Sequence, residues 1–376
     1  MEQTRENETY DFLSKITEIV SHAIEERSPS LHLSALQTSS VPSGVFSSPL
    51  STTLTDLYLD YNDLMELPEE ISQLTNLSTL SLNGNHLKYL PESIGKMTKL
   101  EQLFLSENSL ESLPATFCHL ANLMCLNLLG NRLRYLCEDF GHLVNLRELR
   151  LDENELRALP ESFGSLRQLH TLELLQNELT SLPVEFCQIT HLKTCNLSCN
   201  SLEELPESFG ELGEITVLDV SRNKLGKLMN DFKSAKKLQK LFLEGNVLTF
   251  LPEWFGYMTE IEHLDLSDNH LTNAALPESL GIKSSRLKHL NLGGNYVTDL
   301  PASFGHLFSL EWVHLGSTQS TLERSVYTNG NWIKFLPENF GCLRQLTYLR
   351  LDENQVAALP ANFGDLSNLK TLDLGE

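Results

Sequence analysis

Three histidines in the C-terminal third of the sequence come nearest to a metal-binding arrangement. His263, His289 and His314 stand at nearly regular intervals, and Asp265 and Asn291 lie close to them in the sequence. Imidazole and carboxylate groups are ligand types that bind zinc. Two imidazoles on neighbouring strands could share one ion, but no register places a third ligand. We therefore expect surface histidines here, and we predict neither a metal nor a cofactor.

The residue patterns of common catalytic sites are missing. The sequence contains no G-x-x-x-x-G-K-[ST], H-E-x-x-H, G-x-S-x-G or C-x-x-C pattern, so we predict no catalytic residue and no enzyme activity. The seven cysteines are an odd number, at positions 118, 125, 137, 187, 195, 199 and 342. Because no secretory signal accompanies them, we expect free thiols in a reducing compartment.

The charge balance restricts the class of partner. Twenty-eight Lys and Arg against 50 Asp and Glu give a net charge of −22. Nucleic acid and anionic membranes need a cationic surface, which excludes both, whereas a protein with a basic or mixed surface fits. No run of 18 apolar residues occurs, and the first ten residues are polar and acidic. We therefore predict no membrane span and a cytoplasmic location.

An internal repeat dominates the sequence. Asn recurs every 23 residues from Asn62 to Asn269 and returns at 295, 331 and 354. Around each Asn stands the frame L-x-x-L-x-L-x-x-N-x-L-x-x-L-P-x-x-F-G-x-L-x-x-L, of which Leu149–Leu169 is a clean copy. A fixed period sustained over thirteen units is the signature of a repeat architecture.

This frame resembles the leucine-rich repeat family of the 23-residue intracellular type, including Ras-group and scaffold-type repeats and effectors of intracellular bacteria. The resemblance implies an α/β horseshoe solenoid with a parallel β-sheet on its concave face. Short helical, 3-10 or extended segments would form the convex face. It also implies binding to proteins, with small GTPases or their regulators as partners by family analogy only. Cys137-Glu138-Asp139 resembles the Cys-x-Asp motif of a bacterial ubiquitin ligase domain, but it lies inside a repeat, and we regard the match as coincidence.

Elementary physics assigns a role to each part of the frame. Side chains alternate along a strand, so the two Leu of L-x-L point into a core and the x residue points away. One strand buries too little surface alone, and stacked copies bury a continuous core. The Asn amide can pair with backbone groups left over by the turn. We expect the recurrent Phe side chains to stack as a spine near the convex side.

The ends and the irregular places define the predicted organisation. Residues 1–30 are predicted as an N-terminal helical cap, since apolar residues from Phe12 to Ile24 recur at helical spacing. A partner-binding or membrane-surface helix is the alternative, and its acidity disfavours the membrane. Residues 31–53 are predicted as a degenerate first repeat and 54–376 as the repeat domain. The domain ends in a partial unit, and we expect its edge to be covered either by chain beyond residue 376 or by something else. An insertion at 316–330 is predicted as a surface loop, either a binding element or a tolerated excursion.

The exposed strand positions are the candidate contact sites. Their acids outnumber their bases, which favours a basic partner. Apolar residues there are candidate hot spots, with Phe104 beside Leu129 and Trp312 beside the insertion favoured. The predicted partner-binding residues are Tyr58, Tyr61, Phe104, Leu129, Arg150, Asp152, Glu173, Phe242, Asp265, Trp312, His314, Tyr348 and Arg350.

These features together predict a non-enzymatic scaffold that binds another protein through the concave face and the insertion. One alternative is a secreted bacterial effector, delivered into a host cytoplasm, that binds a host protein with the same face. Another is the targeting region of a larger signalling enzyme or ubiquitin ligase whose catalytic domain lies outside this chain. The sequence does not set the oligomeric state or the partner's identity.

Overall fold

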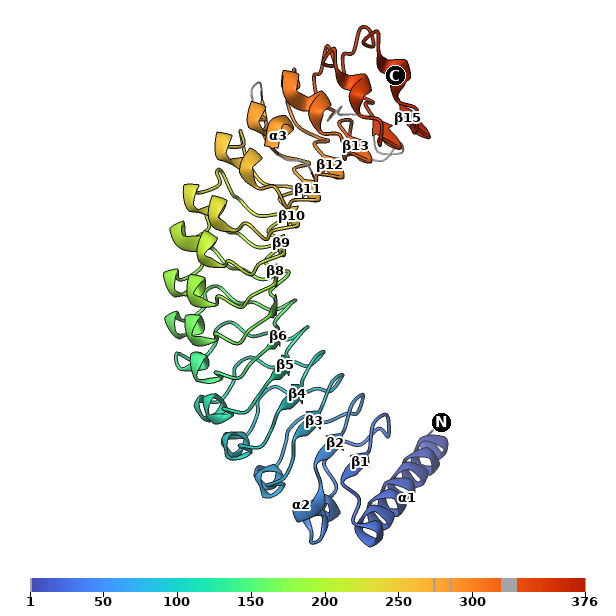
Figure 1. Ribbon diagram of the computed structural model, residues 1–376. Helices are drawn as coiled ribbons and strands as arrows, with labels where there is room; N and C mark the ends of the chain where they lie inside the picture. The colour runs from blue at the N-terminus through green and yellow to red at the C-terminus, as the bar shows by residue number, and fades with distance from the viewer. Residues whose placement is uncertain (1, 273–274, 284–285, 319–329, 376) are drawn as a thin grey trace. The chain divides into compact units, whose positions relative to one another are not determined.

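Figure 1 shows a computed structural model of the chain, which describes residues 2–272, 275–283, 286–318 and 330–375. The chain divides into two compact units, Met1–Leu179 and Thr180–Glu376. In each unit, short parallel strands lie along one side and 3-10 segments along the other (Figure 1). This is the predicted α/β repeat architecture, built from strands of three residues.

The N-terminal unit begins with a long helix and continues as a stack of coils. Its helices are α1 (Glu2–Glu26) and α2 (Leu50–Thr53). Its strands are β1 (Ser30–His32), β2 (Asp56–Tyr58), β3 (Thr79–Ser81), β4 (Gln102–Phe104), β5 (Cys125–Asn127), β6 (Glu148–Arg150) and β7 (Thr171–Glu173). Its 3-10 segments are η1 (Ser43–Phe46), η2 (Glu69–Gln73), η3 (Glu92–Lys96), η4 (Ala115–His119), η5 (Phe140–His142) and η6 (Glu161–Ser165).

The C-terminal unit repeats the same coil. Its strands are β8 (Thr194–Asn196), β9 (Val217–Asp219), β10 (Lys240–Phe242), β11 (His263–Asp265), β12 (His289–Asn291), β13 (Trp312–His314), β14 (Tyr348–Arg350) and β15 (Thr371–Asp373). Its 3-10 segments are η7 (Val184–Gln188), η8 (Glu207–Glu211), η9 (Asn230–Ser234), η10 (Glu253–Tyr257), η11 (Ala302–His306), η12 (Phe340–Cys342) and η13 (Phe363–Asp365). In the coil between those of η10 and η11, a short α-helix, α3 (Glu278–Lys283), takes the place of the 3-10 segment.

The register of the strands places the repeat's leucines in line. Leu80 pairs with Leu103 in parallel register, and Leu241 pairs with Leu264 in the C-terminal unit. These central leucines are at most 2% exposed, so they face the interior, whereas Leu372 of the last strand, β15, is 41% exposed. Successive strands therefore bury one continuous apolar row in each unit, which one strand alone could not do.

The recurrent Asn is a buried connector between coils. Asn131 donates from Nδ2 to the carbonyls of Leu105 and Leu128, at 2.9 and 3.0 Å. Its Oδ1 accepts a hydrogen bond from the Leu110 amide at 3.0 Å. One side chain thus satisfies backbone groups of its own coil and of the preceding coil, which confirms the predicted structural role.

A column of phenylalanine rings fills the space behind the 3-10 segments. In the C-terminal unit Phe209 stacks on Phe186 and Phe232, with ring centroids 6.3 and 5.7 Å apart. All three side chains are at most 1% exposed. The predicted spine is therefore present, although its last member, Phe363, is only half-buried.

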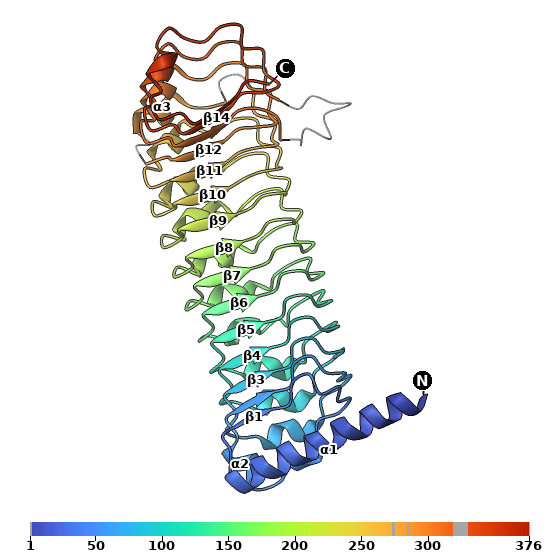
Figure 2. The same cartoon turned by 90° about the vertical axis from the view of Figure 1, so that its right-hand side faces the viewer.

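Helix α1 lies against the first coil of the N-terminal unit (Figure 2). Ile16, Val20 and Ala23 are each 5% exposed, and Val20 approaches Gly44 so closely that an added Cβ there would lie 2.8 Å from it. Strand β1 pairs with β2, so a coil does occupy the degenerate stretch. The division into a cap at 1–30, a first repeat at 31–53 and repeats at 54–376 stays a prediction.

The prediction that all cysteines are free is wrong. Cys118 and Cys137 form a disulfide, and Cys125, Cys187, Cys195, Cys199 and Cys342 are free. Cys118 lies in η4, and Cys137 replaces the proline that opens the next return segment. Stacking of successive coils brings these two places together, which sequence spacing alone did not reveal.

Two further predictions concern loops and membrane segments. Most of the insertion at 316–330 lies outside the described residues, because positions 319–329 are not among them. No helix in the described part of the chain is long and apolar enough to cross a bilayer.

Candidate functional site

We call the side of the strands that points away from the leucine core the open face of each unit. In the N-terminal unit it carries several predicted contact residues. Tyr58, Phe104 and Leu129 are half-buried, and Arg150 is exposed. Tyr58 stacks on His32 with ring centroids 4.5 Å apart. The aromatic residues of the L-x-L frame therefore point away from the core, as predicted.

The remaining residues predicted for this unit lie near the same face. Glu173 ends β7 and is half-buried. Tyr61 follows β2 in a left-handed turn with φ of 54° and is 62% exposed.

The open face of the C-terminal unit carries a row of rings across four adjacent strands. His263 of β11 stacks on His289 of β12, with centroids 4.3 Å apart and planes 10° apart. His289 faces Trp312 of β13 at 6.4 Å, and Trp312 stacks on Tyr348 of β14 at 5.2 Å. These residues are cross-strand partners, so the parallel register alone aligns them. Stacked side chains hold one another in place, which makes this row a rigid aromatic surface.

A shallow cavity of about 190 Å³ lies beside this row. Its walls are Phe242, His263, Leu264, Asp265, His289, Asn291 and Trp312. Three predicted contact residues, Phe242, Asp265 and Trp312, thus meet at one site. Apolar walls with a few fixed polar groups are typical of binding sites.

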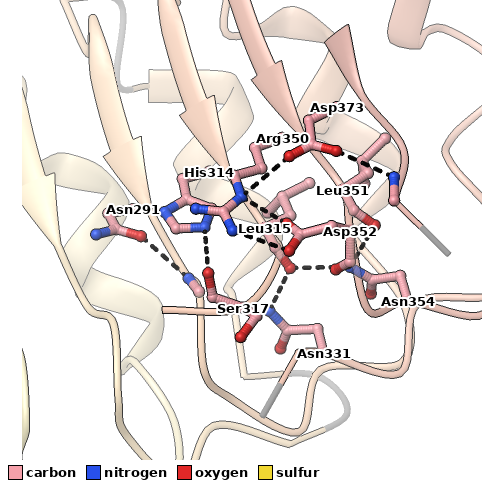
Figure 3. A network of polar contacts seen from close by, with 12 residues as sticks. Asn291, His314, Leu315, Ser317, Asn331, Arg350, Leu351, Asp352, Asn354 and Asp373 are labelled. Atoms are coloured by element: carbon pink, nitrogen blue, oxygen red, sulfur yellow. Dashed lines mark hydrogen bonds and ion pairs between the residues drawn. The ribbon is translucent and has the colours of Figure 1, made fainter. Parts of the chain in front are cut away.

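A network of ion pairs and hydrogen bonds adjoins the row at β13–β15 (Figure 3). The guanidinium of Arg350 donates to both carboxylate oxygens of Asp352, at 2.7 and 2.9 Å. Asp373 lies 3.5 Å from Arg350 Nε. Asp352 is fully buried, so this pairing fixes Arg350 on the open face.

Two predicted contact residues are buried rather than exposed. Asp152 is 7% and His314 8% exposed. Asp152 accepts a hydrogen bond from the Leu175 amide at 3.1 Å, and burial raises the pKa of its carboxyl. His314 Nε2 lies 3.1 Å from the Ser317 carbonyl oxygen. Asp152 turns back onto the backbone of the next coil and His314 onto the backbone of its own coil, so the expectation that they are exposed is wrong.

Asp152 stands two residues before the repeat Asn154, and other residues at this position are also hydrogen-bonded between coils. Asp60 and Asn83 occupy it in successive coils, and each accepts a hydrogen bond from the backbone amide of the next occupant, at 2.9 Å. Asp152 follows the same pattern, whereas Leu129 and Leu175 occupy the position in other coils, so this polar ladder links some coils only. Polar residues at many copies of this position were the available sequence signal.

The histidine set is only partly brought together. His263 and His289 stack, whereas His314 turns toward Ser317. Within the described residues no group of three His, Cys, Asp or Glu side chains is arranged to hold a metal ion. Burial lowers the pKa of His263, and the nearby His289 and Lys240 lower it further. This shift favours the neutral imidazole on the cavity wall.

Two of the free thiols, Cys125 and Cys187, have a raised pKa. Burial raises the pKa of Cys187 to about 12, and burial with the charge of Glu148 raises the pKa of Cys125. A raised pKa leaves the thiol protonated and poorly nucleophilic at neutral pH.

Protonation of His314 is expected to destabilise the C-terminal unit. Burial lowers its folded pKa, and Arg350 lowers it further. An unfolded histidine has a pKa of about 6.5. Just below that pH, His314 is therefore protonated in the unfolded chain but still neutral in the folded chain. The free energy of unfolding therefore falls as the pH falls through about 6.5 toward the lowered folded pKa.

Thermal unfolding followed by circular dichroism at about pH 7.5 and 5.5 tests this. We expect the midpoint temperature to drop less between the two pH values in His314→Gln than in the unchanged chain. The glutamine amide can still donate to the Ser317 carbonyl. His142→Gln, at an exposed position, is the control. Equal drops in the unchanged chain and in His314→Gln would contradict the prediction.

Comparison with known families agrees with this geometry. Models described as leucine rich repeat match residues 167–225 and 230–271, and residues 76–97, 99–120, 145–166 and 286–307. The chain belongs to the leucine-rich repeat family. Leucine-rich repeat domains generally mediate protein–protein interaction, and the fold is typically a non-catalytic scaffold. No curated protein matches the sequence.

Several solved leucine-rich repeat structures are similar to this chain. A leucine-rich repeat protein of Leptospira interrogans is 29% identical with a TM-score of 0.81, over 96% of this chain and 93% of that one. The plant peptide hormone receptor RGFR1, solved in complex with RGF2, is 30% identical with a TM-score of 0.76, over 92% and 55%. YopM, an effector of Yersinia pestis, is 23% identical with a TM-score of 0.67, covers both chains fully and supports the fold alone.

Proposed function

We propose that this leucine-rich repeat chain is a cytoplasmic interaction module that binds another protein through the open faces of its sheets. The observation that carries the proposal is the rigid ring row from His263 to Tyr348, beside a cavity that contains Asp265. A preformed surface loses little freedom on binding, so most of its contact energy contributes to affinity. The insertion at 316–330 follows β13 and extends the same site in this proposal.

The partner is expected to have a basic or mixed surface. The chain's net charge of −22 attracts cationic patches and disfavours nucleic acid. Among similar structures, the plant receptor RGFR1 was solved with RGF2 bound, so its repeats are compatible with a bound partner. A small GTPase or one of its regulators is the partner class that family analogy suggests.

Pull-down from a cell lysate tests the contact site. We expect Trp312→Ala and Phe104→Ala each to reduce capture of the partner by about tenfold or more, because aromatic side chains dominate interface energies. Quantitative mass spectrometry of the captured proteins is the measurement. Tyr257→Ala, at a position 61% exposed in η10, is the matched control and should capture the same proteins. If neither change on the open face alters the captured set, the assignment of the site is wrong.

Two finer versions of this function stay predictions. In the first version, the chain is a secreted bacterial effector that binds a host protein. In the second, it is the targeting region of a larger enzyme and brings the catalytic domain of that enzyme to its target. The genomic source and the full open reading frame distinguish them, since neither version changes the chemistry of the open face.

A further inference from the structure

The cavity on the C-terminal unit lies between two rows of side chains. One row is the ring row of His263, His289 and Trp312, and the other consists of Phe242, Asp265 and Asn291 on β10–β12. Leu264 lies between the two rows with its side chain in the interior, so the side chains that wall the cavity on the open face are aromatic rings together with Asp265 and Asn291. It opens onto the face on which the proposed partner binds.

Two carboxylates flank the ring of Phe242. Phe242 pairs across the sheet with Asp219 on β9 and with Asp265 on β11. Neighbouring strands are about 4.8 Å apart, so a cation above the ring would lie within reach of both carboxylates. In the part of the chain that the structure describes, neither Asp219 nor Asp265 has a basic side chain within ion-pair distance.

Both carboxylates are held in fixed orientations. Ser221 donates to Asp219 Oδ1 from its amide at 2.9 Å and from its hydroxyl, and Ser267 does the same to Asp265 at 2.9 and 2.6 Å. Asn291 Nδ2 donates to the other oxygen of Asp265 at 3.1 Å. Asp265 accepts bonds on both oxygens and faces the cavity, so it is oriented before a partner arrives.

From this geometry we infer that the cavity receives an arginine side chain of the protein partner. The inference rests on the proposed function and specifies which chemistry that partner presents. A guanidinium is planar, stacks on aromatic faces and donates several hydrogen bonds in a rigid fork. Phe242 and Trp312 supply the aromatic surfaces and Asp265 the acceptor in the cavity wall, while Asp219 is a second acceptor on β9, across the sheet from Phe242.

Lysine fits this cavity less well than arginine. An ammonium is compact and strongly hydrated, and it cannot stack as a plane on an aromatic ring. Lys240, the cross-strand partner of His263, is exposed, so water and salt screen its repulsion of an incoming cation. His263 is favoured in its neutral form by burial, so it adds little repulsion at neutral pH.

Matched peptides test the inference directly. An array of random decapeptides, each present with a central arginine and again with citrulline or lysine there, is probed with the full chain. Citrulline keeps the shape of arginine and lacks its charge. We expect arginine members to bind about tenfold more tightly than their citrulline partners, as loss of a charged pair implies.

Two variants localise the effect to the cavity. Asp265→Asn keeps an acceptor for Ser267 and removes the charge, and Phe242→Leu removes the ring. Both should bring the arginine-to-citrulline ratio close to about one. Asp56→Asn on β2 of the N-terminal unit is the matched control and should leave the ratio unchanged. Circular dichroism and the thermal midpoint show that each variant is folded.

The outcomes separate this inference from the proposed function. Peptide binding without an arginine preference, or a preference that survives both variants, would overturn the inference and leave the open-face function intact. If neither Phe104→Ala nor Trp312→Ala changes the proteins captured in the pull-down, the proposed binding site itself is wrong. Binding to an oligosaccharide array that depends on Trp312 would also overturn the inference, because it would assign the cavity to a sugar.

Discussion

Replacement of Phe209 by alanine is expected to lower the free energy of unfolding of the C-terminal unit by about 4 kcal/mol. Phe209 is 1% exposed and stacks on Phe186 and Phe232. The change removes a ring from the middle of a column, so it leaves a cavity and deprives both neighbours of a contact. Each coil contacts mainly its neighbours, so the loss should be concentrated in the surrounding coils.

Urea unfolding followed by circular dichroism and by hydrogen exchange measures this loss. Phe209→Leu should cost less, because a branched aliphatic side chain fills part of the space. Phe308→Ala is the control, since Phe308 is 57% exposed and such surface changes stay within about 0.5 kcal/mol. Equal losses for Phe209→Ala and Phe308→Ala would show that the ring column does not stabilise the repeats.

Replacement of Asn131 by alanine is expected to cost about 3 kcal/mol in the N-terminal unit. The change leaves the Leu110 amide without its partner and removes one of the two Asn donors from each of the carbonyls of Leu105 and Leu128, which keep Asn108 and Asn154. Asn131 is 7% exposed, so water cannot easily replace these bonds. Each buried polar group that loses its partner carries a penalty of about 1–3 kcal/mol.

Native-state hydrogen exchange gives the sharpest measurement. The Leu110 amide should lose most of its protection in Asn131→Ala, while amides several coils away keep theirs. Asn122→Ala is the control: Asn122 is exposed, and its Nδ2 donates to the Thr98 carbonyl at 2.8 Å. A Leu110 amide that remains fully protected in Asn131→Ala would contradict the connector role.

These two variants also bear on the binding surface. Phe209 and Asn131 lie away from the exposed side chains of the open face, yet they hold the coils that position them. The ring row from His263 to Tyr348 depends on adjacent strands staying in register. The proposed binding surface therefore rests on stacked coils whose stability comes mainly from buried leucine, phenylalanine and asparagine.

Much of the fold was determined by the sequence alone. A frame of 23 residues assigns each Leu, Asn and Phe a repeated environment, because every coil contacts copies of itself. The frame therefore predicted the parallel strands, the core leucines, the buried Asn and the phenylalanine column. It also placed Tyr58, Phe104 and Phe242 on the open face, since side chains alternate along a strand.

Only the tertiary structure decided how side chains on neighbouring coils meet. Alternation along a strand says which face a residue occupies, and it does not say whether the side chain extends to solvent or turns back onto the backbone. Asp152 and His314 turn back and are buried, while Cys118 and Cys137 meet across a coil boundary. The cavity between Phe242 and Trp312 likewise depends on lateral distances between strands, which sequence spacing does not contain.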